Sequence, residues 1–402
     1  MARQARRVET AGLAPPFVDG GAICWSEALG SNVLDVDGNR YVDLTSGFGV
    51  AAVGHRHPAV VRAIRRQAGR LIHGLGDAQG HTARAELAAV LARRVPISGA
   101  RVAFAVSGAD AVELAVKTAL LATRRHRIVA FRPSYHGLTF GALALTSRGH
   151  FRSPFTRHLH RQVRHLPYGC DLALLRTSFE SEPVAALVVE PIVGREGVIV
   201  PPAGWLQAVH ALCRRYEVLF VVDEILTGCG RTGRWFAVEH DGIEPDLLCC
   251  GKALAGGMPL AAVVGRAAIM AAWDSPGEAR HTATFVAHPL ACAAALAALE
   301  VISRQRLVAR AAALGRRFGS ALRDWPGRIH AVREVRGRGA LWGIEWKTAA
   351  AAHAFVESAR RRGLLLLGGG EQGRVTQLLP ALTMADRQLE YAVRALSQAA
   401  SE

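Results

Sequence analysis

The chain has 402 residues, half of them hydrophobic, which is enough for a large buried core in two or three domains. Its formal net charge is +16, but the arginines are dispersed and few aromatic residues lie among them, so we expect no nucleic-acid binding. No apolar run is long enough to span a membrane, and no apolar stretch follows the basic start MARQARR. We therefore expect a cytoplasmic protein without a membrane partner.

The cysteines and histidines give no metal-binding pattern. The seven cysteines are scattered, without a CxxC pair or zinc-like spacing, and are expected to be reduced core thiols. His55 with His57 and His158 with His160 form two H-x-H pairs, but no third ligand is evident for either pair. We expect no metal site.

The first half of the chain changes from a hairpin pattern to an alternation of strands and helices. Residues 33–44 alternate apolar and polar around Asp37-Gly38, which indicates a hairpin. Helices are expected at 57–69, opened by Pro58, and at 82–95. Apolar strands then alternate with helices, as in a mainly parallel sheet that is buried on both faces. The expected strands are 102–106, 128–131, 186–189, 218–222, 247–250 and 261–264.

From Pro289 on, the pattern changes to long Ala-rich helices. Helices are expected at 290–304 and 306–323, followed by strands within 331–346 and helices near 350–362 and 384–399. This order is typical of a smaller α+β domain beside the first. We expect residues 1–50 to form an N-terminal segment packed on the small domain, 51–288 the large domain, and 289–402 the small domain.

Lysine is rare in this chain, which draws attention to Lys252. Of 49 basic residues only three are lysines, Lys117, Lys252 and Lys347. Arginine cannot replace lysine where a deprotonated amine must act as a nucleophile. Lys252 follows an expected strand among apolar and small residues, and such surroundings lower the pKa of an amine. A P-loop is excluded, because that motif needs Gly at 246 and Ser or Thr at 253, where the chain has Asp246 and Ala253.

Asp223 stands at the carboxyl end of the expected strand 218–222. Ligands of open α/β sheets bind at that edge, and a carboxylate there is costly unless it is paired. A helix N-cap or a loop ion pair would explain Asp223 equally well.

Two further segments follow strands in the same way. Ser107, Gly108 and Ala109 lead from a strand into a helix whose first amides can hold an anion, although Ser107 can also be a plain N-cap. Tyr135 follows the strand 128–131 and can stack on a planar ring, although a core tyrosine is the simpler interpretation. Together with Asp223 and Lys252, these residues supply the parts of a pyridoxal 5'-phosphate site.

At this point the sequence resembles the class III (ω-type) aminotransferases of the fold type I pyridoxal-phosphate enzymes. The resemblance covers nearly the whole chain, and it lies in the segments DVDGNRYVDL, GHRHP, SGADAVELAVKTA, SYHG, VVEPIVG, VVDEILTGCGRTGR, GKALAGGMPLAAV and HTATFVAHPLACAAALAAL. It implies an α/β fold with a mainly parallel seven-stranded-type sheet in the large domain and a small α+β domain. It also implies a homodimer with shared active sites.

The resemblance implies catalytic roles for two residues. Lys252 would form the covalent link to the cofactor aldehyde and later move a proton, and Asp223 would pair with the pyridine nitrogen. The remaining cofactor contacts would come from Tyr135 and Ile225 on the ring faces, from Ser107, Gly108 and Ala109 at the phosphate, and from Thr284 of the other subunit. Glu190 would be a supporting or substrate-side carboxylate. His136 would support the cofactor site from outside, although a hydrogen-bonded structural histidine explains it equally well.

Four positions depart from the family and bear on the substrate. Leu138 and Gln377 stand where an arginine is common, Arg195 stands where a glutamate is usual, and Leu226 stands where a glutamine is common. Glutamine cannot match the bidentate, charged contact of arginine with a carboxylate. One hypothesis is that Arg195 replaces the missing arginine from the opposite wall; a surface arginine is the alternative.

These departures predict an aminotransferase that takes its amino group from a primary amine, an amino sugar or an ω-amino compound rather than from a simple dicarboxylate pair. The acceptor would be a keto acid or another carbonyl compound. An aminomutase, racemase or decarboxylase on the same scaffold stays open as an alternative, because all of these would share Lys252 and Asp223. A non-catalytic protein is disfavoured, since none of the core site residues is lost.

Overall fold

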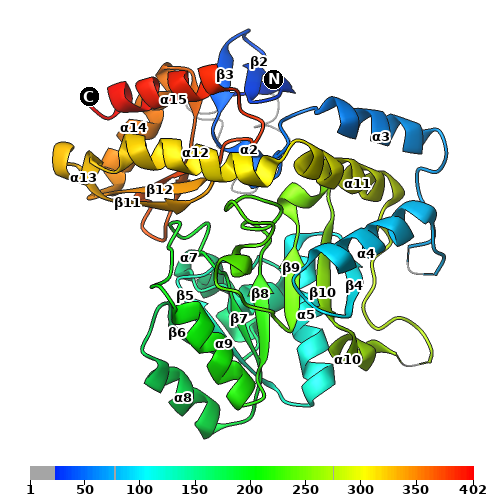
Figure 1. The fold of residues 1–402 in the computed structure, drawn as a ribbon. Helices are drawn as coiled ribbons and strands as arrows, with labels where there is room; N and C mark the ends of the chain where they lie inside the picture. The colour runs from blue at the N-terminus through cyan, green and yellow to red at the C-terminus, as the bar shows by residue number, and fades with distance from the viewer. Residues whose placement is uncertain (1–22, 77, 275) are drawn as a thin grey trace.

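A seven-stranded sheet forms the centre of the molecule in the computed structural model, which describes residues 23–402 except 77 and 275. Figure 1 shows this sheet in the lower half, below the C-terminal helices and strands. The strand order is β4-β10-β9-β8-β7-β5-β6. The bounds are β4 Ala100–Ala105, β5 Arg127–Arg132, β6 Val163–Pro167, β7 Val184–Val189, β8 Leu219–Asp223, β9 Leu247–Cys250 and β10 Ala261–Arg266.

The expected mainly parallel sheet is confirmed. Strand β10 runs antiparallel to β4 and β9, whereas the pairs β9-β8, β8-β7, β7-β5 and β5-β6 are parallel. Each of the six expected strands exists, with ends shifted by at most two residues. Strand β6 was not expected, because its sequence VRHLP lacks the apolar run of a buried strand. It is the edge strand of the sheet, and most of its side chains are only half-buried, so it needs no continuous apolar run.

Helices bury both faces of this sheet. Alternate side chains of β9 point to opposite layers: Leu247 and Cys249 pack with α5 (Gly108–Thr123), and Leu248 and Cys250 pack in the cluster on the other face. That second layer contains α4 (Thr82–Arg94), α8 (Leu172–Ser181), α9 (Trp205–Arg215) and α11 (Pro289–Arg304). The two buried faces explain why these strands are apolar throughout.

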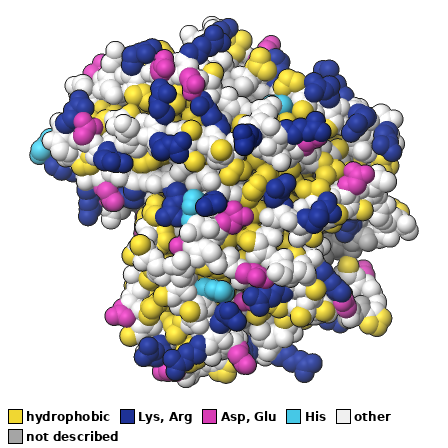
Figure 2. All heavy atoms as spheres, in the orientation of Figure 1, with side chains coloured by type: hydrophobic (Ala, Val, Ile, Leu, Met, Phe, Trp, Pro, Cys, Tyr) yellow, Lys and Arg dark blue, Asp and Glu magenta, His cyan; other side chains and the backbone are white. Residues whose placement is uncertain are grey.

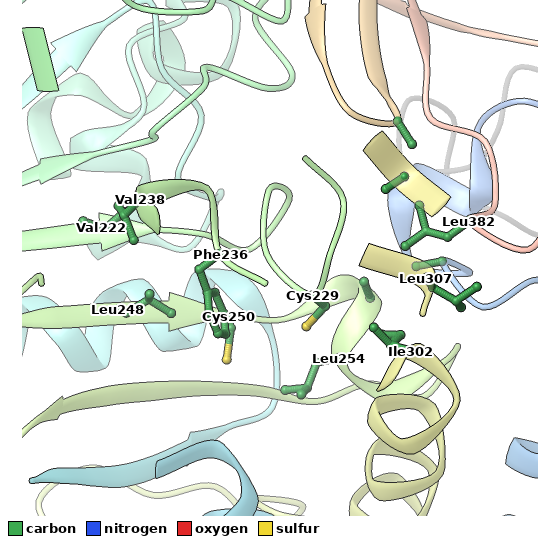
Figure 3. Packing of buried hydrophobic residues seen from close by; sticks show 14 of the residues in the cluster. Val222, Cys229, Phe236, Val238, Leu248, Cys250, Leu254, Ile302, Leu307 and Leu382 are labelled. Carbon is green, nitrogen blue, oxygen red and sulfur yellow. The ribbon is translucent and has the colours of Figure 1, made fainter. Parts of the chain in front are cut away.

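One continuous apolar core joins the sheet to the C-terminal part of the chain. Figure 3 shows Cys250 and Leu254 beside the end of β9, with Ile302 of α11, Leu307 and Leu382 in the same cluster. Since a core shared in this way fixes the two parts against each other, the end of β9 is held firmly where the chain continues to Lys252.

The terminal parts of the chain form two smaller sheets. Strands β1 (Trp25–Leu29), β2 (Asn32–Asp35), β3 (Arg40–Asp43) and β13 (Leu364–Leu365) form one, and β11 (Val332–Arg338), β12 (Leu341–Trp346), β15 (Val375–Leu378) and β14 (Leu367–Gly369) form the other. The expected hairpin is β2-β3, with φ of +85° at Gly38. The remaining helices are α2 (Ser46–Gly49), α3 (Pro58–Ala68), α6 (Phe140–Leu145), α7 (Gly149–Arg152), α10 (Ala267–Met270), α12 (Leu307–Leu322), α13 (Trp325–Arg328), α14 (Ala349–Arg361), α15 (Asp386–Ala399) and the short 3₁₀ turns η1 (Ser153–His158), η2 (Ala237–His240), η3 (Lys252–Ala255) and η4 (Ala271–Trp273).

The pairing of β3 with β13 links the first part of the chain to the last, since Val42 and Asp43 lie beside Leu364 and Leu365. Domains at 1–50, 51–288 and 289–402 stay our proposal for the organisation of the chain, and residues 1–22 of the first lie outside the described residues. Within the described ranges, no helix is long and apolar enough to cross a membrane.

The shared core predicts a large effect of Ile302→Ala. Ile302 is fully buried, so we expect the truncation to lower the free energy of unfolding by about 2–5 kcal/mol through lost burial and a residual cavity. Leu29→Ala, at a half-exposed position of β1, is the control and should cost less than about 1 kcal/mol. Denaturant titration of both variants checks this, and equal losses would contradict it.

Candidate active site

Two neighbouring strands bring Asp223 and Lys252 to the same edge of the sheet. Asp223 at the end of β8 lies beside Cys249 of β9, and the Glu224 N–H donates to the Cys249 carbonyl oxygen at 2.9 Å. Lys252 follows three residues later, as the first residue of η3. The sheet register therefore places the carboxylate and the amine at one site, as the sequence predicts.

The backbone and the surroundings of Lys252 are both unusual. Its φ is +39°, in the left-handed region that a side chain with a Cβ rarely adopts, and such strain is concentrated at functional sites. Burial lowers the pKa of the Lys252 ammonium below its ordinary value, although the negative charges of Asp223 and Glu190 act in the opposite sense. A lowered pKa makes the neutral, nucleophilic amine more available at neutral pH.

Asp223 is buried and is held by two donors. The Ile225 N–H donates to Asp223 Oδ1 at 3.1 Å, and His136 Nδ1 lies 2.8 Å from Asp223 Oδ2. Burial alone would lower the pKa of His136, but the hydrogen bond and charge of Asp223 outweigh it and raise that pKa. His136 thus touches the carboxylate directly and orients it.

Glu190 joins two loops of the site. Its carboxylate accepts from the Tyr135 N–H at 3.0 Å and from the Gly194 N–H at 2.9 Å. Burial raises its pKa to about 7, and Asp223 contributes in the same sense, whereas His136 opposes it. Glu190 therefore fixes the loop of Tyr135 against the loop that carries Arg195.

The segment from Ser107 to Ala109 begins helix α5. Ser107 is the N-cap of this helix, because its Oγ accepts from the Asp110 N–H at 3.2 Å. The interpretation of Ser107 as an N-cap is therefore confirmed. The Ala111 N–H bonds the Ser107 carbonyl oxygen, which leaves the first amides, those of Gly108 and Ala109, at the open end of a 16-residue helix. These amides and the helix dipole suit a phosphate group.

Ile225 packs directly against Gly108. A Cβ at Gly108 would lie 3.0 Å from both the Cδ1 and the Cγ2 atoms of Ile225, which is closer than side chains normally approach. Glycine at this position therefore lets Ile225 reach the helix start, next to the predicted phosphate contacts. The Tyr135 ring lies edge-on to Phe151, with centroids 5.9 Å apart.

The four departures from the family lie in different surroundings. Gln377 is buried, and its Nε2 donates to the carbonyl oxygens of Gly194 and Arg195, each at 3.0 Å. The Arg195 guanidinium lies over the Tyr135 ring, 4.6 Å from its centroid. Gln377 of β15 thus bonds the backbone of the loop that carries Arg195, and these carbonyl oxygens occupy its amide.

The other two departures, Leu226 and Leu138, differ in exposure. A Cβ at Gly194 would lie 2.1 Å from Leu226 Cδ2, and Leu226 also reaches Gly49, so this side chain fills an apolar gap beside the site. Leu138 is 47% exposed, and Thr284 is exposed as well. Among the described residues, neither Leu138 nor Thr284 bonds to the residues around Lys252, and Thr284 lies instead beside Gly76.

Sequence reasoning missed the inward carboxylate of Glu224 and the pair of Arg148 and Glu196. Glu224 points away from Asp223 and is fully buried, accepting from the Val238 N–H at 2.9 Å and from the Thr227 hydroxyl. Arg148 lies 3.7 Å from the Glu196 carboxylate, although the two are far apart in sequence. The alternation of a strand could have indicated that Glu224 faces opposite to Asp223, but no pattern in an arginine-rich chain singles out Arg148.

The residues present fit pyridoxal 5'-phosphate. The site offers a poised amine, a buried carboxylate held by His136, a helix start with free amides, and a glycine at which a Cβ would strike Ile225. Among the described residues, no group of three or more His, Cys, Asp or Glu side chains could hold a metal ion.

Comparison with known proteins agrees with this geometry. The family model of aminotransferase class-III matches residues 17–400. The chain belongs to the class III aminotransferases. As a member of this family it is a transferase that uses pyridoxal 5'-phosphate, and the expected fold type I architecture is confirmed.

Relatives of this class III aminotransferase are similar over almost their whole length. The acetylornithine aminotransferase of Methanosarcina mazei is 38% identical over 375 residues, which is 93% of this chain and 91% of the relative. The ornithine aminotransferase of Toxoplasma gondii, in a structure with partial occupancy of PLP at the active site, is 32% identical with a TM-score of 0.91 and coverage of 99% and 93%. The acetylornithine aminotransferase of Elizabethkingia anophelis is 29% identical with a TM-score of 0.85 and coverage of 99% and 97%.

The position of Lys252 predicts that Lys252→Ala abolishes turnover while cofactor still binds without a covalent link. Because no other amine ends at this sheet edge in the described chain, we expect a loss of at least about a thousandfold. Lys347→Ala, at an exposed lysine, is the matched control and should keep full activity. Turnover and borohydride fixation of the cofactor check this, and substantial transamination by Lys252→Ala would refute it.

The burial of Glu224 predicts a pH-dependent stability. Burial raises its pKa from 4.5 to about 7, so the folded state holds a proton that the unfolded state has lost between these values, and stability falls as pH rises through that window. Glu224→Gln should remove about 3 kcal/mol of the loss between pH 5 and pH 8. Denaturant titration measures it, with the exposed Glu390→Gln as control, and an unchanged slope in Glu224→Gln would contradict the idea.

Proposed function

We propose that this class III aminotransferase moves an amino group from a primary amine, an amino sugar or an ω-amino compound to a keto acid or another carbonyl acceptor, in two ping-pong half-reactions. This proposal rests on the hydrogen bonds of the side chain at position 377, which is a glutamine. The Gln377 amide is occupied by the carbonyl oxygens of Gly194 and Arg195, so this position offers no cation to a substrate carboxylate. The guanidinium of Arg195 is the cation of the loop that Gln377 bonds.

Each of the predicted residues has a task in this scheme. Bound pyridoxal 5'-phosphate supplies the aldehyde and the electron-accepting ring. Lys252 Nζ carries the amine that holds the cofactor and moves the proton from the amine-bearing carbon of the donor. Asp223, held by His136, would pair with the pyridine nitrogen, and Gly108 and Ala109 would bind the phosphate through their amides, with Ser107 capping the helix.

Tyr135 and Ile225 would enclose the ring of the cofactor. Ile225 has its place against Gly108, at the start of the helix that holds the phosphate. Tyr135 is fixed through its N–H by Glu190 and carries Arg195 on one face. This chain of contacts would connect ring binding to the group that receives the substrate.

Arg195 suits the recognition of an acceptor carboxylate. Among the described residues its guanidinium has no hydrogen bond or ion pair within the molecule, and it is partly exposed. Arginine binds a carboxylate through two parallel hydrogen bonds, and aromatic faces hold its plane. Leu226 fills an apolar gap beside the site at another of the departures, which favours a donor without a second charged end.

A second candidate donor is acetylornithine, because that is the substrate in the names of relatives that are 37–39% identical. Aminomutase, racemase and decarboxylase activities are not favoured, since the family and the named relatives are aminotransferases. A panel of amines, amino sugars and acetylornithine, followed by the cofactor absorbance, separates the two donor classes. Acetylornithine as the best donor by far would overturn the first proposal.

We also propose a homodimer in which Thr284 of one subunit contacts the cofactor phosphate of the other. The ring of His73 lies 5.4 Å from that of Phe285, so the segments that hold them are neighbours. These segments expose apolar side chains to an extent unusual for a monomer, with Ile72 59%, Leu75 65% and Phe285 63% exposed. A second copy over this face would bury them and would bring the exposed Thr284 to an interface.

The proposed role of Arg195 predicts the effect of Arg195→Met. We expect the KM for keto acids to rise about tenfold or more, because a charge-assisted hydrogen-bond pair is lost, while kcat with a neutral aldehyde acceptor stays within about twofold. Steady-state kinetics with pyruvate, 2-oxoglutarate and an aldehyde measure this. Arg316→Met, in the helix α12, is the matched control. An unchanged KM for every acceptor would sink the proposal.

A further inference from the structure

Two arginines and one carboxylate gather around the ring of Phe151. The guanidinium carbon of Arg195 lies 5.2 Å from the centroid of that ring, and that of Arg148 lies 5.3 Å from it. Glu196, the neighbour of Arg195 in the chain, places its carboxylate 3.7 Å from Arg148 Nη1. The loop of α7 and the loop after β7 thus meet at a cluster with two positive charges and one negative charge.

The carboxylate of Glu196 pairs with only one of the two arginines in the described residues. Glu196 forms an ion pair with Arg148, whereas no such pair involves Arg195 in the described part of the chain. Both carboxylate oxygens of Glu196 lack a hydrogen-bond partner there, so the ion pair is its main compensation. Burial raises the pKa of Glu196, and the charges of Arg148 and Arg195 oppose this shift. The charge of Arg148 is therefore neutralised inside the protein, and that of Arg195 is not.

Glu196 and Arg148 differ in how far their side chains are exposed. The side chain of Glu196 is 0% exposed, and that of Arg148 is 22% exposed. Part of the Arg148 side chain therefore reaches the surface, although its Nε atom is buried, whereas the carboxylate of Glu196 is covered. Glu196 does not contact a substrate itself; its charge pairs with Arg148 and acts less strongly on Arg195.

We propose that Glu196 is a specificity-determining residue, which masks Arg148 so that the acceptor meets one free guanidinium, that of Arg195, and acceptors with a single carboxylate are preferred over dicarboxylates. This inference rests on the proposed carboxylate-binding role of Arg195. An acceptor with a second carboxylate would need a second free cation beside Phe151. In the native protein that cation is paired, and separating it would leave a buried, unpaired carboxylate.

The test compares binding of glutarate, which has two carboxylates, with binding of pentanoate, which has one. Dissociation constants are measured by titration calorimetry on the holoenzyme, so the readout does not depend on turnover. Glu196→Gln keeps the shape of the side chain and releases Arg148. We expect it to raise the preference for glutarate over pentanoate about tenfold or more, since a new charge-assisted contact becomes available.

Two further variants identify the cause. Glu196→Gln combined with Arg148→Gln should return the preference to the wild-type value, because the released cation is gone. Glu371→Gln, at an exposed carboxylate that also acts on Glu196 through its charge, is the matched control and should leave the preference unchanged. An unchanged preference in Glu196→Gln, or a rise that persists in the double variant, would overturn the inference.

The double variant also keeps the test decisive if Glu196→Gln alone does not fold, because it removes both charges of the pair and leaves neither of them buried alone. Since Arg148 is masked in the native protein, the affinity of the double variant for either acid should differ from that of the wild type by less than about twofold, whereas a larger loss would show that Arg148 already binds substrate and would overturn the inference. Arg195→Met reports on the proposed function separately, because it should weaken both acids together. Glutarate and pentanoate binding that is insensitive to Arg195→Met would refute the proposed function, whatever the ratio in Glu196→Gln.

Discussion

The parallel pairing of β8 with β9 is the constraint on which the site depends. Its register places Asp223 beside Cys249, and the chain needs only three more residues to reach Lys252. Both strands are buried on both faces, so neither can slide without moving apolar side chains out of the core. The distance between the carboxylate and the amine is thereby set by backbone hydrogen bonds rather than by flexible side chains.

The alternation along β8 also separates two adjacent carboxylates. Asp223 faces the site and meets His136, whereas Glu224 turns into the protein and meets Thr227 and the Val238 amide. Two acidic groups at one strand end would repel each other if both faced the cofactor. Because they point in opposite directions, Asp223 contacts the imidazole of His136, whereas Glu224 is buried in the protein, where burial raises its pKa.

The predicted substrate-binding side of the site is organised differently, because its charged side chains lie on loops rather than at strand ends. Gln377 fixes the backbone of the loop, Glu190 fixes its start at Gly194, and Arg195 carries the free charge over Tyr135. Relatives with the same fold carry the names of acetylornithine and ornithine aminotransferases. The architecture that this chain shares with them supports the cofactor, whereas the four departures lie outside the seven-stranded sheet, Gln377 in β15 and the other three in loops.

Local patterns determined the elements and the cofactor chemistry. The apolar runs of the buried strands, the Asp37-Gly38 turn and the glycines after the strands are signals carried within a few residues, as is the rarity of lysine that marks Lys252. The edge strand β6 carried no such run and was missed.

Only the tertiary structure decided which side chains meet across loops. The contact of His136 with Asp223, the use of the Gln377 amide by the backbone, and the burial of Glu196 behind Arg148 each join residues 48 to 183 positions apart. Such contacts depend on sheet register and loop packing, and a single sequence carries no periodic signal for them.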